Sequence, residues 1–132
     1  MPEDADFPKR GQDELFRSAT KTHSKVLQCG TEDGQIFRLE RVAPLAPITC
    51  YLTNLYVVGL ADVIRVSALD DSINCIVTMS AWNGYTSQAK EWARRREIGL
   101  FTFGEFMGAL HWTRFWMYAK KDEDGNPIFA YR

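Results

Sequence analysis

Residues 73–110 constrain the fold most, because short apolar runs alternate there with amphipathic segments. The apolar runs are rich in β-branched residues, and the first is followed by the turn residues Asn83 and Gly84, which favours buried strands. Between the runs, apolar residues recur at i, i+3 and i+4 behind Thr86, a good N-cap, which favours a helix. The pattern predicts strands at 73–80 and 98–103 and helices at 87–96 and 105–111. Strand, helix, strand, helix on a parallel sheet is an α/β unit.

The rest of the chain extends this unit on both sides. Upstream, apolar periodicity and turn residues predict helices at 13–28 and 55–69, strands at 35–42 and 48–52, and a turn at 30–34. Downstream, alternation and the Asp124-Gly125 turn predict a β-hairpin. We therefore expect three segments, namely a flexible N-terminal arm at 1–11, an α/β domain at 12–111 and a hairpin extension at 112–132.

The composition is that of one globular domain. The chain has 132 residues, of which 45% are hydrophobic and 25% charged, and its formal net charge is −1. This balance argues against a disordered chain and against a strongly basic nucleic-acid binder. No apolar run approaches the roughly 18 residues of a membrane span, and the acidic start is unlike a signal peptide. The three cysteines form no CxxC pair, which favours buried thiols in a reducing cytoplasm.

The unit at 73–110 also resembles a known family. An aromatic residue and Thr86 follow the first strand, Ala89 and Ala93 lie four residues apart on the helix, and an Ile-x-Leu strand and a short helix come next. This order and spacing resemble the back half of the Mrr-like restriction endonuclease domain, within the PD-(D/E)xK nuclease superfamily. The resemblance covers about residues 13–111. It implies a restriction-endonuclease-like mixed sheet flanked by helices.

The catalytic positions of that family are degenerate in this chain. The family places a metal-binding Asp on a strand after a Gly-rich turn, and a Glu-x-Lys motif on the next strand. At the matching positions this chain has Phe37, Thr49 and Tyr51. A phenyl ring, an alcohol and a phenol supply neither the oxygen ligands that Mg²⁺ needs nor the lysine that assists the attacking water. The resemblance therefore implies a nuclease fold without the nuclease chemistry, with no metal and no cofactor.

A metal site rebuilt from other acidic residues is one alternative. Carboxylates occur near the predicted strands and on or after the helix that follows them, at Glu32, Asp33, Glu40, Asp62, Asp70 and Asp71. No Asp/Glu-x-Lys triplet lies on a predicted strand, and an Asp before Gly suits a turn. The two histidines, His23 and His111, have no ligand partner at metal-binding spacing. A metal-dependent endonuclease with a rearranged site would need two of these carboxylates to converge.

A second alternative is a protein that binds DNA or RNA without cleaving it. Three arginines close the predicted helix 87–96, where cations also complement the helix dipole. Two lysines lie four residues apart on the predicted helix 13–28, and two aromatic residues follow a strand end, where ligands often bind in α/β sheets. The predicted nucleic-acid-binding residues are Arg94, Arg95, Arg96, Trp82, Tyr85, Lys21 and Lys25.

The aromatic density of the C-terminal extension predicts a protein interface. A two-stranded ribbon does not bury both of its faces without a partner, and Trp, Tyr and Arg are enriched at interface hot spots. The predicted partner-binding residues are Trp112, Phe115, Trp116 and Tyr118. We expect a protein partner or a homo-oligomer, and no membrane. The alternative is that these aromatic side chains pack on their own domain.

These observations give one leading prediction of function. The chain is expected to be a catalytically inactive nuclease-fold subunit that acts as an interaction or scaffold module in the cytoplasm. The resemblance implies a nucleic-acid-processing, antiviral-defence or mobile-element assembly as its setting. The alternatives are the non-cleaving nucleic-acid binder and the rearranged endonuclease.

Overall fold

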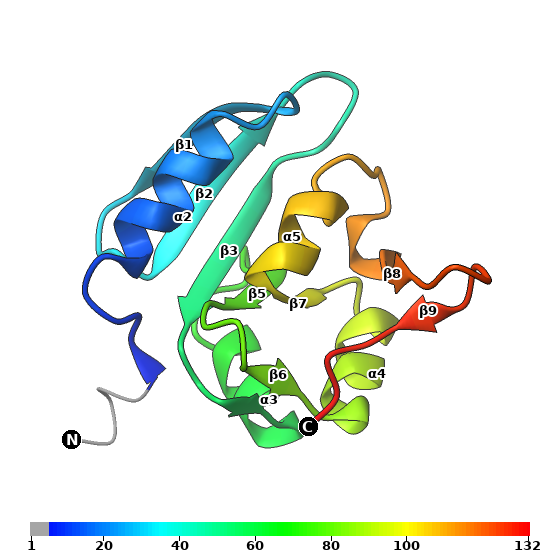
Figure 1. Cartoon of the computed structure of the whole chain (residues 1–132). Helices are drawn as coiled ribbons and strands as arrows, with labels where there is room; N and C mark the ends of the chain where they lie inside the picture. Colours follow the sequence, from blue (N-terminus) through cyan, green and yellow to red (C-terminus); the bar gives the residue numbers. More distant parts are fainter. Residues whose placement is uncertain (1–5) are drawn as a thin grey trace.

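Five strands form one mixed sheet at the centre of the molecule (Figure 1). The computed structural model describes residues 6–132. The strands lie side by side in sequence order, as β1 (Val26–Thr31), β2 (Ile36–Arg41), β3 (Ile48–Thr53), β5 (Cys75–Thr78) and β7 (Gly99–Thr102). The β1–β2 and β2–β3 pairs are antiparallel, whereas the β3–β5 and β5–β7 pairs are parallel. The prediction of an α/β protein with a mixed sheet is confirmed.

Helices cover both faces of this sheet and enclose two hydrophobic cores. The helices α2 (Gln12–Lys21) and α5 (Phe103–Ala109) bury Phe16 and Phe106 in the first core. The helices α3 (Leu60–Ser67) and α4 (Ser87–Arg95) bury Val63 and Ala93 in the second core. The apolar side of each helix thus packs on an apolar face of the sheet, which is the layered arrangement expected of α/β proteins.

The strand β3 contributes to both cores. Its side chains alternate, so that Cys50 and Leu52 enter the first core and Tyr51 enters the second. Five of its six residues are buried. A strand that is covered on both faces has a nearly continuous apolar sequence. This is why β3 could be predicted from the sequence.

Two short ribbons lie outside the main sheet. The strand β4 (Val57–Val58) pairs in parallel with β6 (Gly84–Tyr85), and β8 (Lys120–Lys121) pairs antiparallel with β9 (Pro127–Ile128). The chain then returns to β6, where Tyr131 bridges to Tyr85. In Figure 1 this last segment, in red, passes β6 and α4.

The strands and helices predicted within residues 73–110 are all present. The helix predicted at 13–28 is wrong for its second half, which forms a turn and a strand. The helix α2 ends at Lys21, and Val26–Thr31 is the strand β1. The turn between them is fixed by His23, whose Nδ1 accepts the backbone N–H of Lys25 at 3.0 Å. Backbone pairing of β1 with β2 then outweighs the helical periodicity of the sequence.

The helix predicted at 55–69 begins later, at Leu60. Residues 57–58 form β4, and Gly59 is extended at φ −95° and ψ 176°. The backbone N–H of Gly59 donates to the carboxylate of Asp62 at 2.9 Å, which starts α3 at this point.

The predicted C-terminal hairpin is shorter than expected. The Asp124-Gly125 turn is present, with Gly125 at φ 84°, but each strand of the ribbon has only two residues. The aromatic run before it forms a 3₁₀ turn, Phe115–Met117, because Phe115 is drawn into the first core.

The described part of the predicted N-terminal arm contacts β3. The backbone carbonyl of Asp6 accepts the N–H of Asn54 at 3.2 Å, and the Thr53 hydroxyl oxygen lies 2.7 Å from the same carbonyl oxygen. The first five residues of the arm lie outside the described residues.

All three cysteines are buried as free thiols, as the sequence predicted. Burial raises the pKa of the Cys29 and Cys50 thiols, so both remain protonated and unreactive. Among residues 6–132, every helix is too short or too polar to span a bilayer.

The N-cap of α4 gives a direct test of the central unit. Thr86 Oγ1 accepts the backbone N–H of Ala89 at 3.1 Å, so we expect Thr86→Ala to lower the free energy of unfolding by about 1 kcal/mol. Urea denaturation measures this loss. The control is Ser87→Ala at the next position, which should change the free energy by less than about 0.5 kcal/mol. Equal losses in the two variants would contradict the cap.

Candidate functional site

The strands β2 and β3, which carry Phe37, Thr49 and Tyr51, are neighbours in the sheet, but Phe37 does not share a face with the other two. In the β2–β3 register Phe37 lies opposite Cys50, whereas Tyr51 lies opposite Ile36. Residues opposite each other project from the same sheet face, so Phe37 faces the first core, where its ring centre lies 4.9 Å from that of Phe16. Thr49 and Tyr51 project from the other face. Phe37, Thr49 and Tyr51 therefore do not line one cleft.

A polar cluster occupies the face to which Tyr51 and Thr53 project. The Tyr51 hydroxyl donates to Asp6 Oδ2 at 2.6 Å, the Thr53 hydroxyl donates to Asp6 Oδ1 at 2.6 Å, and Arg65 donates to Oδ2 at 3.2 Å. Burial, together with the bond to Asp6, raises the pKa of Tyr51 to about 12, so the phenol stays neutral and donates. Three donors thus bind a single carboxylate. These contacts hold Asp6 against β3 and α3, so the cluster has a structural role.

The other acidic residues cap turns and helices or lie exposed. Asp33 Oδ1 accepts the backbone N–H groups of Gln35 at 2.9 Å and Ile36 at 2.8 Å, which confirms its predicted turn role. Asp62 caps α3, and Asp70 accepts the hydroxyl of Ser72 at 2.7 Å. The remaining three candidates, Glu32, Glu40 and Asp71, are exposed. Within residues 6–132, no three of the His, Cys, Asp and Glu side chains are grouped closely enough to hold a metal ion.

The two histidines lie together, which their separation in sequence did not indicate. Their ring centres are 4.5 Å apart. Both nitrogens of His23 are engaged, because Nδ1 accepts from Lys25 and Nε2 lies 2.9 Å from the carbonyl oxygen of Met107. Burial lowers the pKa of His23 and favours this neutral ring. The pair has a structural role.

The three arginines of α4 point in different directions. Arg94 donates to the carbonyl of Met117 at 3.0 Å, Arg95 pairs with Glu91, and Arg96 lies 3.8 Å from the ring centre of Trp92. Successive helical residues are about 100° apart, so three in a row do not share a face. The three arginines therefore do not form one surface, and their binding to nucleic acid stays a prediction.

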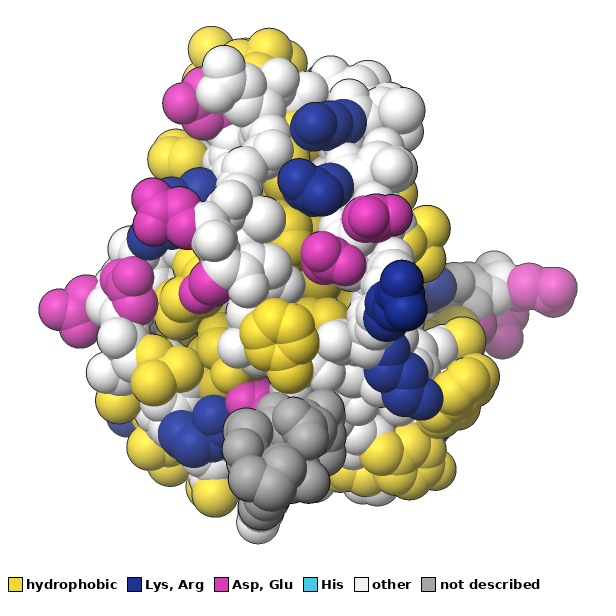
Figure 2. Space-filling model, turned by 90° about the vertical axis from the view of Figure 1, so that its left-hand side faces the viewer, with side chains coloured by type: hydrophobic (Ala, Val, Ile, Leu, Met, Phe, Trp, Pro, Cys, Tyr) yellow, Lys and Arg dark blue, Asp and Glu magenta, His cyan; other side chains and the backbone are white. Residues whose placement is uncertain are grey.

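The other predicted nucleic-acid-binding residues are also dispersed. Lys21 ends α2 and Lys25 lies beyond it, so the two do not form a helical ladder. Trp82 is exposed, but Tyr85 is fully buried and donates to Glu105 at 2.8 Å. Figure 2 views the side that carries α2 and β1, and acidic, basic and apolar side chains are mixed on it.

A buried lysine that the sequence analysis did not single out lies beside Tyr85. Lys90 is 1% exposed, its Nζ donates to the carbonyl of Leu100 at 2.6 Å, and it lies 4.2 Å from the ring centre of Phe101. Burial lowers the pKa of Lys90 to about 8, although the nearby carboxylate of Glu105 acts in the opposite sense. Its position three residues before Ala93 puts Lys90 on the buried side of α4, but the apolar pattern of the sequence does not distinguish it from a solvent-facing lysine.

The predicted partner-binding residues divide between the core and a surface pocket. Phe115 is buried in the first core with Arg41 5.4 Å from its ring centre, and Trp116 packs edge-on against it at 5.4 Å. Trp112 is 58% exposed and lines a pocket with Tyr118. Phe115 is therefore a core residue, and its prediction as a contact residue is wrong.

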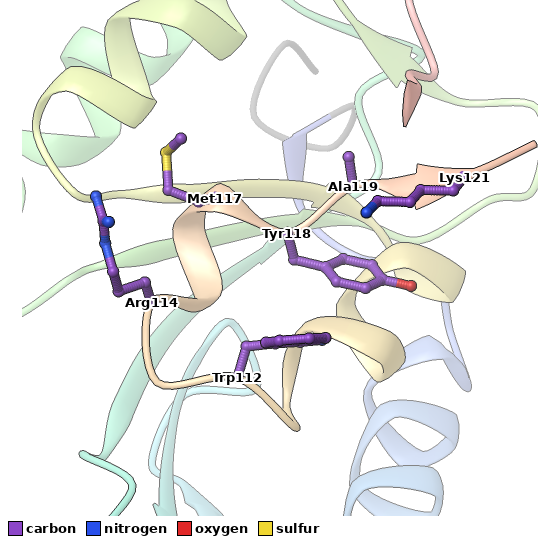
Figure 3. A pocket seen from close by; sticks show the side chains of 6 residues that line it. All are labelled: Trp112, Arg114, Met117, Tyr118, Ala119 and Lys121. Atoms are coloured by element: carbon purple, nitrogen blue, oxygen red, sulfur yellow. The ribbon is translucent and has the colours of Figure 1, made fainter. Parts of the chain in front are cut away.

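This aromatic pocket has a cavity volume of about 480 Å³. Its lining residues are Trp112, Arg114, Met117, Tyr118, Ala119 and Lys121. Figure 3 shows the rings of Trp112 and Tyr118 projecting in the same direction, with Arg114 at one end and Lys121 at the other. Neither cation forms an ion pair with a carboxylate of residues 6–132.

A buried arginine holds the wall of the aromatic pocket in place. Arg41, on β2, is 4% exposed and donates through Nη1 to the carbonyls of Leu110 at 3.0 Å and Trp112 at 2.9 Å. Its Nε donates to the carbonyl of Ala46 at 2.7 Å. The exposed Trp112 is therefore attached to the rigid sheet, which lowers the entropy cost of binding through it.

No protein-family model, no curated protein and no solved structure matches this chain.

The buried lysine gives a test based on pH. The folded-state pKa of Lys90, about 8, is below its ordinary value of 10.5, so the buried charge costs stability in full below pH 8. This cost falls as the pH rises from 8 to 10.5. Lys90→Met removes this pH-dependent cost together with the bond to Leu100, so we expect its free energy of unfolding, relative to that of the wild type, to be higher at pH 7 than at pH 10.

Urea denaturation of both proteins from pH 7 to pH 10 measures this difference. The matched control is Lys9→Met, which replaces an exposed lysine and should show no gain at any pH. A difference between Lys90→Met and the wild type that does not change with pH would contradict the lowered pKa.

Proposed function

We propose that this chain is a non-cleaving subunit with a nuclease-like fold, and that it binds a protein partner through the aromatic pocket. The mixed sheet with helices on both faces and the Thr86-capped helix support the resemblance to Mrr-like domains. The observation that carries the function is the exposed Trp112 beside two cations without ion-pair partners among the described residues. From the resemblance we propose a nucleic-acid-processing, antiviral-defence or mobile-element assembly as its setting.

The absence of catalytic chemistry supports this choice over an endonuclease. The family positions hold Phe37, Thr49 and Tyr51, and Phe37 lies on the opposite face from the other two. The carboxylate of Asp6, on the face to which Tyr51 projects, is already bound by Tyr51, Thr53 and Arg65. A hydrated Mg²⁺ would have to displace these donors.

The chemistry of the pocket indicates what kind of partner it fits. The apolar surfaces of Trp112, Met117 and Tyr118 suit one aromatic or branched aliphatic side chain, and Arg114 and Lys121 attract carboxylates on either side of it. The proposed partner is therefore an acidic segment with a single apolar anchor.

A random-peptide display selection against the pure protein tests this surface. We expect it to enrich acidic peptides with one aromatic or aliphatic residue. Trp112→Ala should weaken their binding by about thirtyfold, because truncating a central aromatic anchor costs about 2 kcal/mol.

Replacing Arg114 and Lys121 by Gln should weaken binding and reduce its dependence on salt. The matched control is Tyr56→Ala, which removes an equally exposed aromatic residue elsewhere and should leave binding unchanged. Selected peptides that are basic, or that ignore Trp112→Ala, would refute the proposed partner.

A cleavage assay tests the loss of catalysis. Incubation with plasmid DNA, single-stranded DNA and RNA in Mg²⁺ or Mn²⁺ should give no hydrolysis above a no-protein control, since residues 6–132 hold no group of three His, Cys, Asp or Glu side chains that could bind the ion. Metal-dependent cleavage that disappears in Asp6→Asn would show that the polar cluster is an active site after all.

A further inference from the structure

The last residues of the chain, 129–132, lie along β6 as an added strand. The backbone N–H of Tyr85 donates to the carbonyl of Ala130 at 3.0 Å, and the carbonyl of Tyr85 accepts the N–H of Arg132 at 2.9 Å. Arg132 Nε also donates to the carbonyl of Trp82 at 3.1 Å. We call the surface under this segment the β6 groove, lined by Trp82, Gly84, Tyr85, Lys90 and Arg94.

Close approach of the two backbones requires glycine at the centre of the groove. A Cβ atom on Gly84 would collide with the carbonyl oxygen of Ala130 and with the side chain of Arg132. The φ of Gly84 is not in the left-handed region, so alanine is conformationally allowed there. The glycine is therefore needed for the docked segment rather than for the fold of β6.

Phe129 is the side chain that anchors the segment. Its ring centre lies 5.0 Å from Arg94 Cζ and 6.0 Å from Lys90 Nζ, and its ring stacks on that of Tyr131 at 5.0 Å. It packs against the second core. Two cations around one aromatic ring form a site that selects an aromatic side chain over an aliphatic one.

The segment is joined to the domain by an exposed linker. Residues 120–128 are all exposed, and Tyr131 is 43% exposed. The two cores take only partly buried residues from this segment, Phe129 and Ala130. Release of the segment would thus open the groove and leave the sheet and its helices in place.

We propose that the β6 groove is a binding site for an extended segment of a partner protein, and that residues 129–132 occupy it until they are displaced. The partner segment pairs with β6 and carries an aromatic residue followed by a small one, as Phe129 and Ala130 do. Strand addition to a sheet edge supplies the backbone bonds, and the Lys90–Arg94 site supplies the preference for the aromatic ring. This site is separate from the aromatic pocket.

The chain's own segment competes with any partner. Because it is tethered, its effective concentration at the groove is about millimolar, and a partner in solution binds only the fraction of molecules that are open. A change that weakens the tethered segment must therefore strengthen binding of the partner segment.

The test uses a labelled peptide, Asn-Pro-Ile-Phe-Ala-Tyr-Arg, and the full chain. Fluorescence anisotropy should show weak binding to the wild type and binding at least about tenfold tighter to Phe129→Ala, whose own segment lacks the anchor. A peptide with Ala in place of Phe should not bind. Gly84→Ala should abolish binding, because the collision applies to either segment. The control Leu15→Ala, an exposed residue of α2, should behave as the wild type does.

Hydrogen exchange shows whether the peptide binds at β6 and whether the Phe129→Ala variant is folded. The amide of Tyr85 should exchange faster in Phe129→Ala than in the wild type and become protected again when the peptide is added. Equal peptide affinity for wild type and Phe129→Ala, or no renewed protection, would overturn the proposal. Light scattering that shows the unlabelled chain dimerising at the assay concentration would also overturn it, since a second copy would then be the occupant.

Discussion

The alternation of side chains along β3 is the constraint on which the rest of the structure depends. This strand is central, and helices cover both of its faces, so each residue must suit one core or the other. Cys50 and Leu52 go to the first core, and Tyr51 goes to the second. A metal site on this strand would need polar groups at alternate positions on one face. Tyr51 and Thr53 do share a face, but both are committed to Asp6.

Elements with strong periodicity could be predicted from the sequence, and short edge elements could not. The strands β5 and β7 and the helices α4 and α5 match the predicted ranges closely, because burial on both sides or on one stripe leaves a clear pattern. The strand β1 was missed, because its first three residues continue the helical pattern of 13–28 and its last two fall in the predicted turn at 30–34. Its apolar residues do not alternate, and its pairing register shifts between Val26 and Gln28. The pairs β4–β6 and β8–β9 have two residues per strand, which is too short for any periodicity.

The sequence also predicted the candidate sites only in part. Adjacency in sequence suggested that Arg94, Arg95 and Arg96 act together, but helical geometry separates them. Aromatic density marked the C-terminal extension correctly as a source of exposed aromatic surface, yet it could not show that Phe115 is buried while Trp112 is exposed. Lys90 was overlooked because lysine is normally a surface residue. Only the Phe101 and Leu100 contacts of its amine show that it belongs to the interior.

The two proposed binding sites are linked by one short ribbon. Lys121, which lines the aromatic pocket, belongs to β8, and β8 pairs with β9 immediately before Phe129 enters the β6 groove. If a ligand in the pocket stabilises residues 129–132 in the groove, thermodynamic linkage requires an occupant of the groove to weaken binding in the pocket by the same free energy.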